Sequence, residues 1–70
     1  MTYKFHVLGV PVFARRLPSG SLAVWHPYNS AVRELVEPIC RNRGYWRATH
    51  NNWIVHACFC ETVLADLAVA

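Results

Sequence analysis

The stretch LPSGSLAVWHPYNSAVRELVEPIC, residues 17–40, holds a turn, a strand and the start of a helix in succession. In residues 17–20 the proline presets φ at the second turn position, and the glycine can adopt a positive φ at the fourth. This pattern predicts a type I hairpin turn closed by a glycine bulge, with residues 21–26 as the return strand. After that strand, Asn29 or Ser30 can accept a hydrogen bond from a helix N–H group. The stretch therefore predicts a hairpin strand followed directly by an α-helix.

The segment after this cap has the periodicity of an amphipathic helix. Apolar residues recur on one side of the helix, at Val32, Leu35, Val36, Ile39 and Cys40. Pro38 lies inside the segment and removes a backbone hydrogen bond, so a kink is expected there. Gly44 favours the left-handed conformation that commonly ends a helix. We therefore expect one kinked helix that ends just before Gly44.

Two strands are expected before the hairpin turn. Residues 3–8 and 10–16 are rich in β-branched and aromatic side chains, and Gly9 is the expected bend between them. Pro11 cannot donate a ladder hydrogen bond. The second strand should therefore begin at a bulge or lie at a sheet edge.

A second hairpin and a closing helix follow the predicted helix. Residues 45–50 and 53–57 flank Asn51 and Asn52, a pair that tolerates left-handed backbone and predicts a two-residue hairpin turn. The last segment returns to helical spacing, with one apolar side formed by Cys60, Val63, Leu64, Leu67 and Ala68.

The resulting order of elements is βββαββα, without the βαβ alternation of a parallel sheet. We therefore predict a single α+β domain over residues 1–70, in which an antiparallel sheet of about five strands carries two helices packed on one face. The predicted core consists of Val32, Leu35, Val36, Ile39, Trp53, Val55, Leu64 and Leu67.

The composition suggests a surplus of apolar surface. Apolar residues make up 54% of the chain and charged residues 16%, against roughly 25% charged residues in an average soluble protein. A 70-residue chain has little interior in which to hide them. We therefore expect a homodimer, formed through the C-terminal helix or through an edge strand near Pro11.

Missing membrane-spanning and signal-peptide patterns narrow the expected cellular compartment and the expected partners of the protein. The longest uncharged apolar run, residues 5–14, is far shorter than the ~20 residues of a membrane-spanning helix, and no signal-peptide pattern is present. The three cysteines fit reduced thiols better than a disulfide framework. The expectation is a cytoplasmic protein without a membrane partner. The formal charge of +3 by itself identifies no partner.

The second hairpin is the most informative feature for function, because strand alternation divides it into two faces. One face carries Trp46, Ala48, Trp53, Val55 and Ala57, and the other carries Tyr45, Arg47, Thr49, Ile54 and His56. In the simpler interpretation the tryptophan face covers the core and the other face is merely solvated. In the functional interpretation Tyr45, Arg47 and His56, with Arg41 and Arg43 just upstream, form a surface that contacts nucleic acid.

Metal binding and catalysis have weaker support. His56, Cys58 and Cys60 alternate, and Cys40 or His50 would have to complete a zinc site, but no Cys-x-x-Cys pair is present. The four carboxylates all lie on predicted helices, and no nucleophile and base pair or phosphate-binding glycine loop is recognisable. We therefore expect a non-enzymatic protein without metal, cofactor or small-molecule substrate.

Residues 21–68 resemble the HARP domain, an accessory module of annealing helicases. The resembling residues are the strand Leu22-Ala23-Val24, Tyr28-Asn29 before a helix with Leu35-Val36, then Arg43-Gly44-Tyr45, Trp53, Leu64 and Leu67. The resemblance implies a strand, a helix, an Arg/Tyr/Trp hairpin and a final helix, together with binding of single-stranded or forked DNA. Two functions remain open: a nucleic-acid-binding module, and a protein-interaction or self-associating subunit that acts through an exposed apolar patch.

Overall fold

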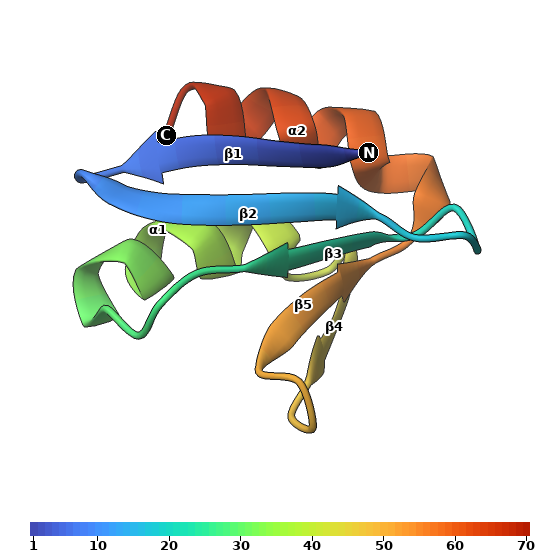
Figure 1. The fold of residues 1–70 in the computed structure, drawn as a ribbon, viewed down its shortest axis with the longest axis horizontal. Coiled ribbons are helices and arrows are strands. Elements are labelled where there is room, and N and C mark those ends of the chain that lie inside the picture. The colour runs from blue at the N-terminus through green and yellow to red at the C-terminus, as the bar shows by residue number, and fades with distance from the viewer.

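The computed structural model describes all 70 residues as one five-stranded antiparallel sheet with two helices (Figure 1). The strands lie side by side in the order β1-β2-β3-β5-β4. The elements are β1 (Thr2–Val7), β2 (Val10–Arg16), β3 (Leu22–Trp25), α1 (Ser30–Cys40), β4 (Gly44–Arg47), β5 (Asn52–Val55), the 3₁₀ turn η1 (Ala57–Phe59) and α2 (Cys60–Ala68). The predicted βββαββα order and α+β class are confirmed.

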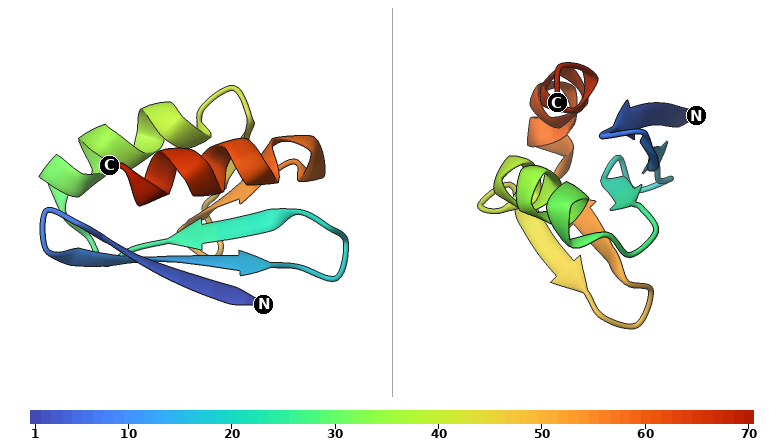
Figure 2. Two further views of the ribbon diagram at one scale, coloured as in Figure 1. Left: turned by 90° about the horizontal axis from the view of Figure 1, so that it is seen from above. Right: turned by 90° about the vertical axis from the view of Figure 1, so that its left-hand side faces the viewer.

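Both helices cover the same face of the sheet (Figure 2). The core lies between the helices and this face, and its fully buried side chains come from every strand except β4 and from both helices. They are Val7, Val12, Ala14, Leu22, Val24, Val32, Val36, Cys40, Val55, Cys60, Val63 and Leu67. The opposite face of the sheet carries no helix and is called the open face below.

The predicted core is right except for Leu35. Val32, Val36, Val55 and Leu67 are buried, and Ile39, Trp53 and Leu64 pack against the core while partly buried. Leu35, by contrast, is 42% exposed. The buried stripe of α1 runs through Val32, Val36 and Cys40. Leu35 lies about 100° around the helix from Val36, at the edge of that stripe.

Both predicted turns of the N-terminal half are present. Leu8 and Gly9 form a two-residue turn with φ of 52° and 77°, so Leu8 belongs to the turn and not to the strand. In the next turn Gly20 has a φ of 93° and donates its N–H to the Leu17 carbonyl at 2.9 Å. The predicted glycine at positive φ is therefore confirmed.

β2 is not an edge strand over its whole length, because it pairs with both β1 and β3. Pairing with β3, however, begins only at Phe13, opposite Trp25. Pro11 lies beyond that stretch, so its missing N–H interrupts no bond to β3. The strand is central over its second half and an edge only at the proline.

Helix α1 begins as predicted and ends earlier. The Asn29 side chain accepts a hydrogen bond from the Val32 N–H at 3.1 Å, which confirms the N-cap. The helix continues through Pro38 and ends at Cys40, and Asn42, not Gly44, takes the positive φ after it, at 67°. Gly44 is instead the first residue of β4. A Cβ atom there would stand 1.9 Å from the Ile54 carbonyl oxygen.

The second hairpin has a longer loop than predicted. Its strands end at Arg47 and restart at Asn52, which leaves a four-residue loop, Ala48 to Asn51, in place of a two-residue turn. Asn51 takes a positive φ of 50°, but Asn52 is a strand residue paired with Arg47. The predicted strands 45–50 and 53–57 are correspondingly too long at the loop and at the end of β5.

The final helix begins without a capping side chain. Phe59 stands at its N-cap position, and the preceding turn η1 leads the chain into α2. Neither helix of the structure has the length and apolar character needed to cross a membrane.

Candidate functional site on the open face

The open face gathers aromatic and basic side chains from strands far apart in the sequence. Alternation along each strand separates its members from the side chains that face the helices, and the register aligns them in rows. One row runs through Thr2, Arg15, Ala23, Ile54 and Tyr45, and the next holds Lys4, Phe13 and Trp25 on one side and Asn52 and Arg47 on the other.

A column of three side chains crosses β1, β2 and β3. The Phe13 and Trp25 rings stack with centroids 5.6 Å apart and an interplanar angle of 27°. The Lys4 Nζ lies 5.9 Å from the centre of the Phe13 ring, in a cation–π arrangement. Trp25 is 41% exposed. The column thus offers a flat aromatic surface with a cation beside it.

The second hairpin adds a further aromatic and basic group to the same face. Tyr45 is 52% exposed, and its ring centre lies 6.2 Å from that of His56. The Arg47 Nε donates a hydrogen bond to the Asn52 side-chain oxygen at 3.3 Å, which orients the guanidinium and leaves its terminal nitrogens free. Tyr45, Arg47 and His56, predicted to lie on one face, are found there.

The ion pairs separate the two sides of the molecule. Four arginines are paired with carboxylates of α1 or α2: Arg16 with Glu61, Arg33 and Arg41 with Glu37, and Arg43 with Asp66. All four acidic residues of the chain lie on the helices. The basic residues without an ion pair are Lys4, Arg15 and Arg47, and these are the three on the open face.

Arg41 and Arg43 are not part of this surface. The Arg41 guanidinium contacts the Glu37 carboxylate at 2.5 Å. Arg43 donates to the Ile39 carbonyl at 3.2 Å and to the Asp66 carboxylate at 2.7 Å, which ties the end of α1 to α2. Both guanidinium groups therefore form ion pairs within the protein.

Four members of the open face, Lys4, Phe13, Arg15 and Trp25, were not among the predicted site residues, although the sequence offered Lys4 and Arg15, with Arg16 and His26, as a second basic patch if their strands are neighbours. Their strands were predicted, so alternation would have put each opposite to a buried neighbour. What joins them to Tyr45 is the pairing of β3 with β5. That pairing brings together two hairpins that are separated in the sequence by α1. No pattern of neighbouring residues predicts it.

The cysteines and histidines do not gather. No three side chains of histidine, cysteine, aspartate or glutamate come together in a way that would hold a metal ion. Cys40 and Cys60 are buried and Cys58 is exposed. The Cys60 thiol donates to the Gly20 carbonyl at 3.4 Å, and burial raises the pKa of the Cys40 thiol to about 12, against a smaller lowering by Arg43.

Comparison of the chain with models of protein families, with curated proteins and with solved structures gives no match.

Proposed function

We propose that this protein is a non-enzymatic module that binds single-stranded nucleic acid on the open face of its sheet. The observation that carries the proposal is the coincidence of the three unpaired cations with the exposed aromatic rings on one face without a carboxylate. The contact residues include three that the sequence predicts: Tyr45, Arg47 and His56. The others are Lys4, Phe13, Arg15 and Trp25. Arg41 and Arg43 have structural roles and do not contact the nucleic acid.

The chemistry of this face suits a flexible, unpaired strand. Lys4, Arg15 and Arg47 can bind phosphates electrostatically, because none of them has to break an internal ion pair to do so. Unstacked bases can stack on the Trp25 and Tyr45 rings, because every base has a flat face that packs against an aromatic ring. The resemblance to the HARP domain, whose family engages single-stranded or forked DNA, agrees with this assignment.

The test uses neighbouring arginines on opposite faces of β2. Arg15 is unpaired on the open face, whereas Arg16 pairs with Glu61 at 3.2 Å on the helix side. Arg15→Ala should lower the logarithmic salt slope of binding by roughly one unit through lost counterion release. Arg16→Ala removes the same charge and should leave that slope nearly unchanged. Fluorescence anisotropy of a labelled single-stranded DNA at several salt concentrations measures both.

Stacking is tested separately with Trp25→Ala and Tyr45→Ala, each of which should weaken binding by about 1–3 kcal/mol. Equal effects of Arg15→Ala and Arg16→Ala would show attraction to net charge alone and contradict a defined surface. Absence of binding at low salt up to tens of micromolar would remove the nucleic-acid function. The protein-interaction subunit would then be the better account.

A further inference from the structure

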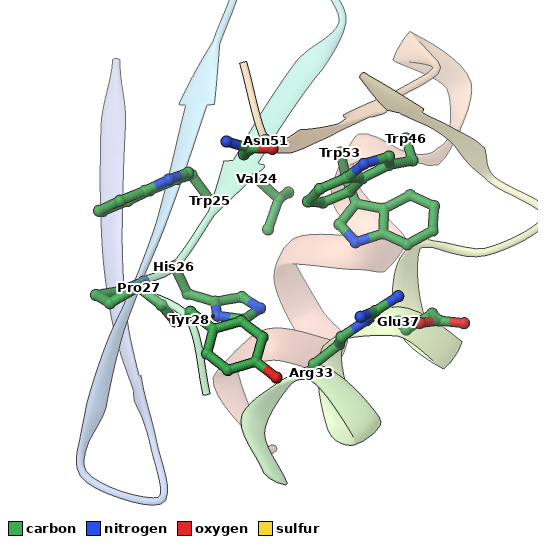
Figure 3. Close-up of a pocket in the computed structure, with 10 residues that line it drawn as sticks. All are labelled: Val24, Trp25, His26, Pro27, Tyr28, Arg33, Glu37, Trp46, Asn51 and Trp53. Carbon is green, nitrogen blue, oxygen red and sulfur yellow. Dashed lines mark hydrogen bonds and ion pairs between the residues drawn. The ribbon is translucent and has the colours of Figure 1, made fainter. Parts of the chain in front are cut away.

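The helix side of the sheet contains a pocket that the open face does not use. It lies between α1, the end of β3 with the chain that follows it, and the second hairpin, and it has a volume of about 600 Å³. Small-molecule sites typically fall between about 300 and 1,000 Å³. Trp46, Trp53, Tyr28, His26, Arg33 and Glu37 supply most of its lining side chains (Figure 3). Trp25 lies at its rim, with its ring turned to the open face, where it stacks on Phe13.

Two indole rings form one wall of the pocket. The centroids of Trp46 and Trp53 are 5.5 Å apart with an interplanar angle of 70°, so one ring presents its edge to the face of the other. Trp46 is 50% exposed although it is on the helix side of β4. Figure 3 shows the His26 and Tyr28 rings across from this wall. A flat ring entering the pocket can therefore contact aromatic surface on more than one side.

The charges at the pocket favour an anion. Glu37 is the carboxylate that lines the pocket, and each of its oxygens contacts an arginine. Arg33 Nε lies 3.3 Å from one oxygen, and a terminal nitrogen of Arg41 lies 2.5 Å from the other. Two guanidinium groups thus face a single carboxylate. The terminal nitrogens of Arg33 make no hydrogen bond within the protein, and Figure 3 shows this guanidinium lying toward the indole rings. A cationic ligand would find no free negative charge here.

We propose that this pocket binds a nucleoside monophosphate, with the base against the Trp46 and Trp53 indoles and the phosphate on the terminal nitrogens of Arg33. The ligand class follows from the combination of aromatic walls with one available guanidinium, which can hold a phosphate through two parallel hydrogen bonds. The site goes beyond the function proposed above, because it lies on the opposite side of the sheet and shares none of the unpaired cations.

The three tryptophans provide the readout. In a ¹H–¹⁵N NMR titration with AMP, the indole N–H signals of Trp46 and Trp53 should shift saturably while that of Trp25 stays in place. Adenosine should bind about tenfold more weakly than AMP, because it lacks the phosphate that Arg33 holds. Inorganic phosphate should leave both indole signals unmoved over the same range. Choline, a probe for a cation-binding aromatic cage, should not shift them either.

Arg33 and Arg41 form a matched pair of variants, because both contact Glu37 and only Arg33 lines the pocket. Arg33→Gln should weaken AMP about tenfold and abolish the preference for AMP over adenosine, whereas Arg41→Gln should change AMP affinity less than twofold. Equal losses in the two variants, a shift of Trp25 alone, binding of choline, or no saturation at millimolar AMP would overturn the site. Arg15→Ala should leave AMP binding unchanged, so either proposal can fail while the other stands.

Discussion

Cys40 is the residue whose chemistry the fold changes most. Its side chain is fully buried in the core on the last turn of α1. Burial removes the thiolate from water and raises the pKa from an ordinary 9.0 to about 12, although the nearby Arg43 guanidinium acts in the opposite direction. Cys58, two residues before the buried Cys60, is exposed. The reactive form of a cysteine is the thiolate, so the fold should make these thiols react very differently.

We expect iodoacetamide at pH 8 to modify Cys58 in the native protein and Cys40 only after unfolding, as read by peptide mass spectrometry. Cys58→Ser is the control and should leave no rapidly labelled site. Because the folded pKa of Cys40 lies above the unfolded value, its contribution to stability is complete below pH 9.0 and declines as the pH rises toward 12. Urea unfolding of Cys40→Ala should lack this part of the decline. Native-state labelling of Cys40 as fast as Cys58 would contradict its burial.

Gly44 shows why some residue roles escape prediction from local sequence. Its position after a helical pattern and two arginines is typical of a helix end. In the structure its lack of a side chain matters because the β5 backbone passes so close that a Cβ atom would overlap the Ile54 carbonyl. The contact joins residues ten positions apart through the hairpin register. Asn29, by contrast, acts on a backbone N–H three residues away, and its cap was predictable.

Within the helices, burial depends on a position's angle to the sheet more than on its apolar character. Leu67 in α2 is buried and Leu35 in α1 is 42% exposed. We expect Leu67→Ala to lower the free energy of unfolding by about 2–5 kcal/mol. Leu35→Ala, the same chemical change, should cost no more than about 0.5 kcal/mol. Chemical denaturation followed by far-UV circular dichroism compares the two, and equal losses would mean that α1 packs with a different face inward.

The second hairpin shows how an error in loop length can leave a prediction about faces intact. A two-residue turn at Asn51 and Asn52 would have paired His50 with Trp53, whereas Trp46 pairs with Trp53. The partner of Trp53 is displaced by an even number of residues, so the side chains that remain within the strands keep their predicted faces. Tyr45 and Arg47 could therefore be assigned correctly to the open face. The two asparagines could not reveal the loop length, because only Asn51 takes the left-handed conformation.

At the scale of the whole molecule, the elements and three residues of the candidate site, Tyr45, Arg47 and His56, could be predicted from the sequence. The hairpin residues of the open face were accessible because they are neighbours in the chain. The Lys4, Phe13 and Trp25 column joins them only through the β1-β2-β3-β5-β4 strand order. The Arg43–Asp66 ion pair likewise depends on how the turn after α1 meets α2, whereas Arg41 pairs with Glu37 four residues earlier, a spacing that the sequence shows. The column and the Arg43–Asp66 pair are tertiary properties that periodicity does not encode.

Self-association is expected of the whole molecule because several large apolar side chains remain exposed, Leu8, Trp25, Tyr28 and Trp46 among them. The expected edge near Pro11 is confined to the start of β2, because β3 covers β2 from Phe13 onward; the outer strands of the sheet are β1 and β4. Sedimentation equilibrium at high micromolar concentration should give the mass of a dimer. Raising the salt concentration should not dissociate it, because apolar burial drives the contact. A monomeric mass under these conditions would contradict the prediction.

The separation of ion pairs from free cations also makes the protein an electric dipole. Four arginines and four carboxylates occupy the helix side, where their charges cancel, so the formal charge of +3 belongs to the open face. In the field of any polyanion the molecule experiences a torque that turns this face forward before contact. This orientation during approach raises the association rate constant. The orienting effect weakens at salt concentrations above about 0.1 M, where the Debye length falls below about 10 Å. The helices, by cancelling their own charges, determine which side of the sheet arrives first.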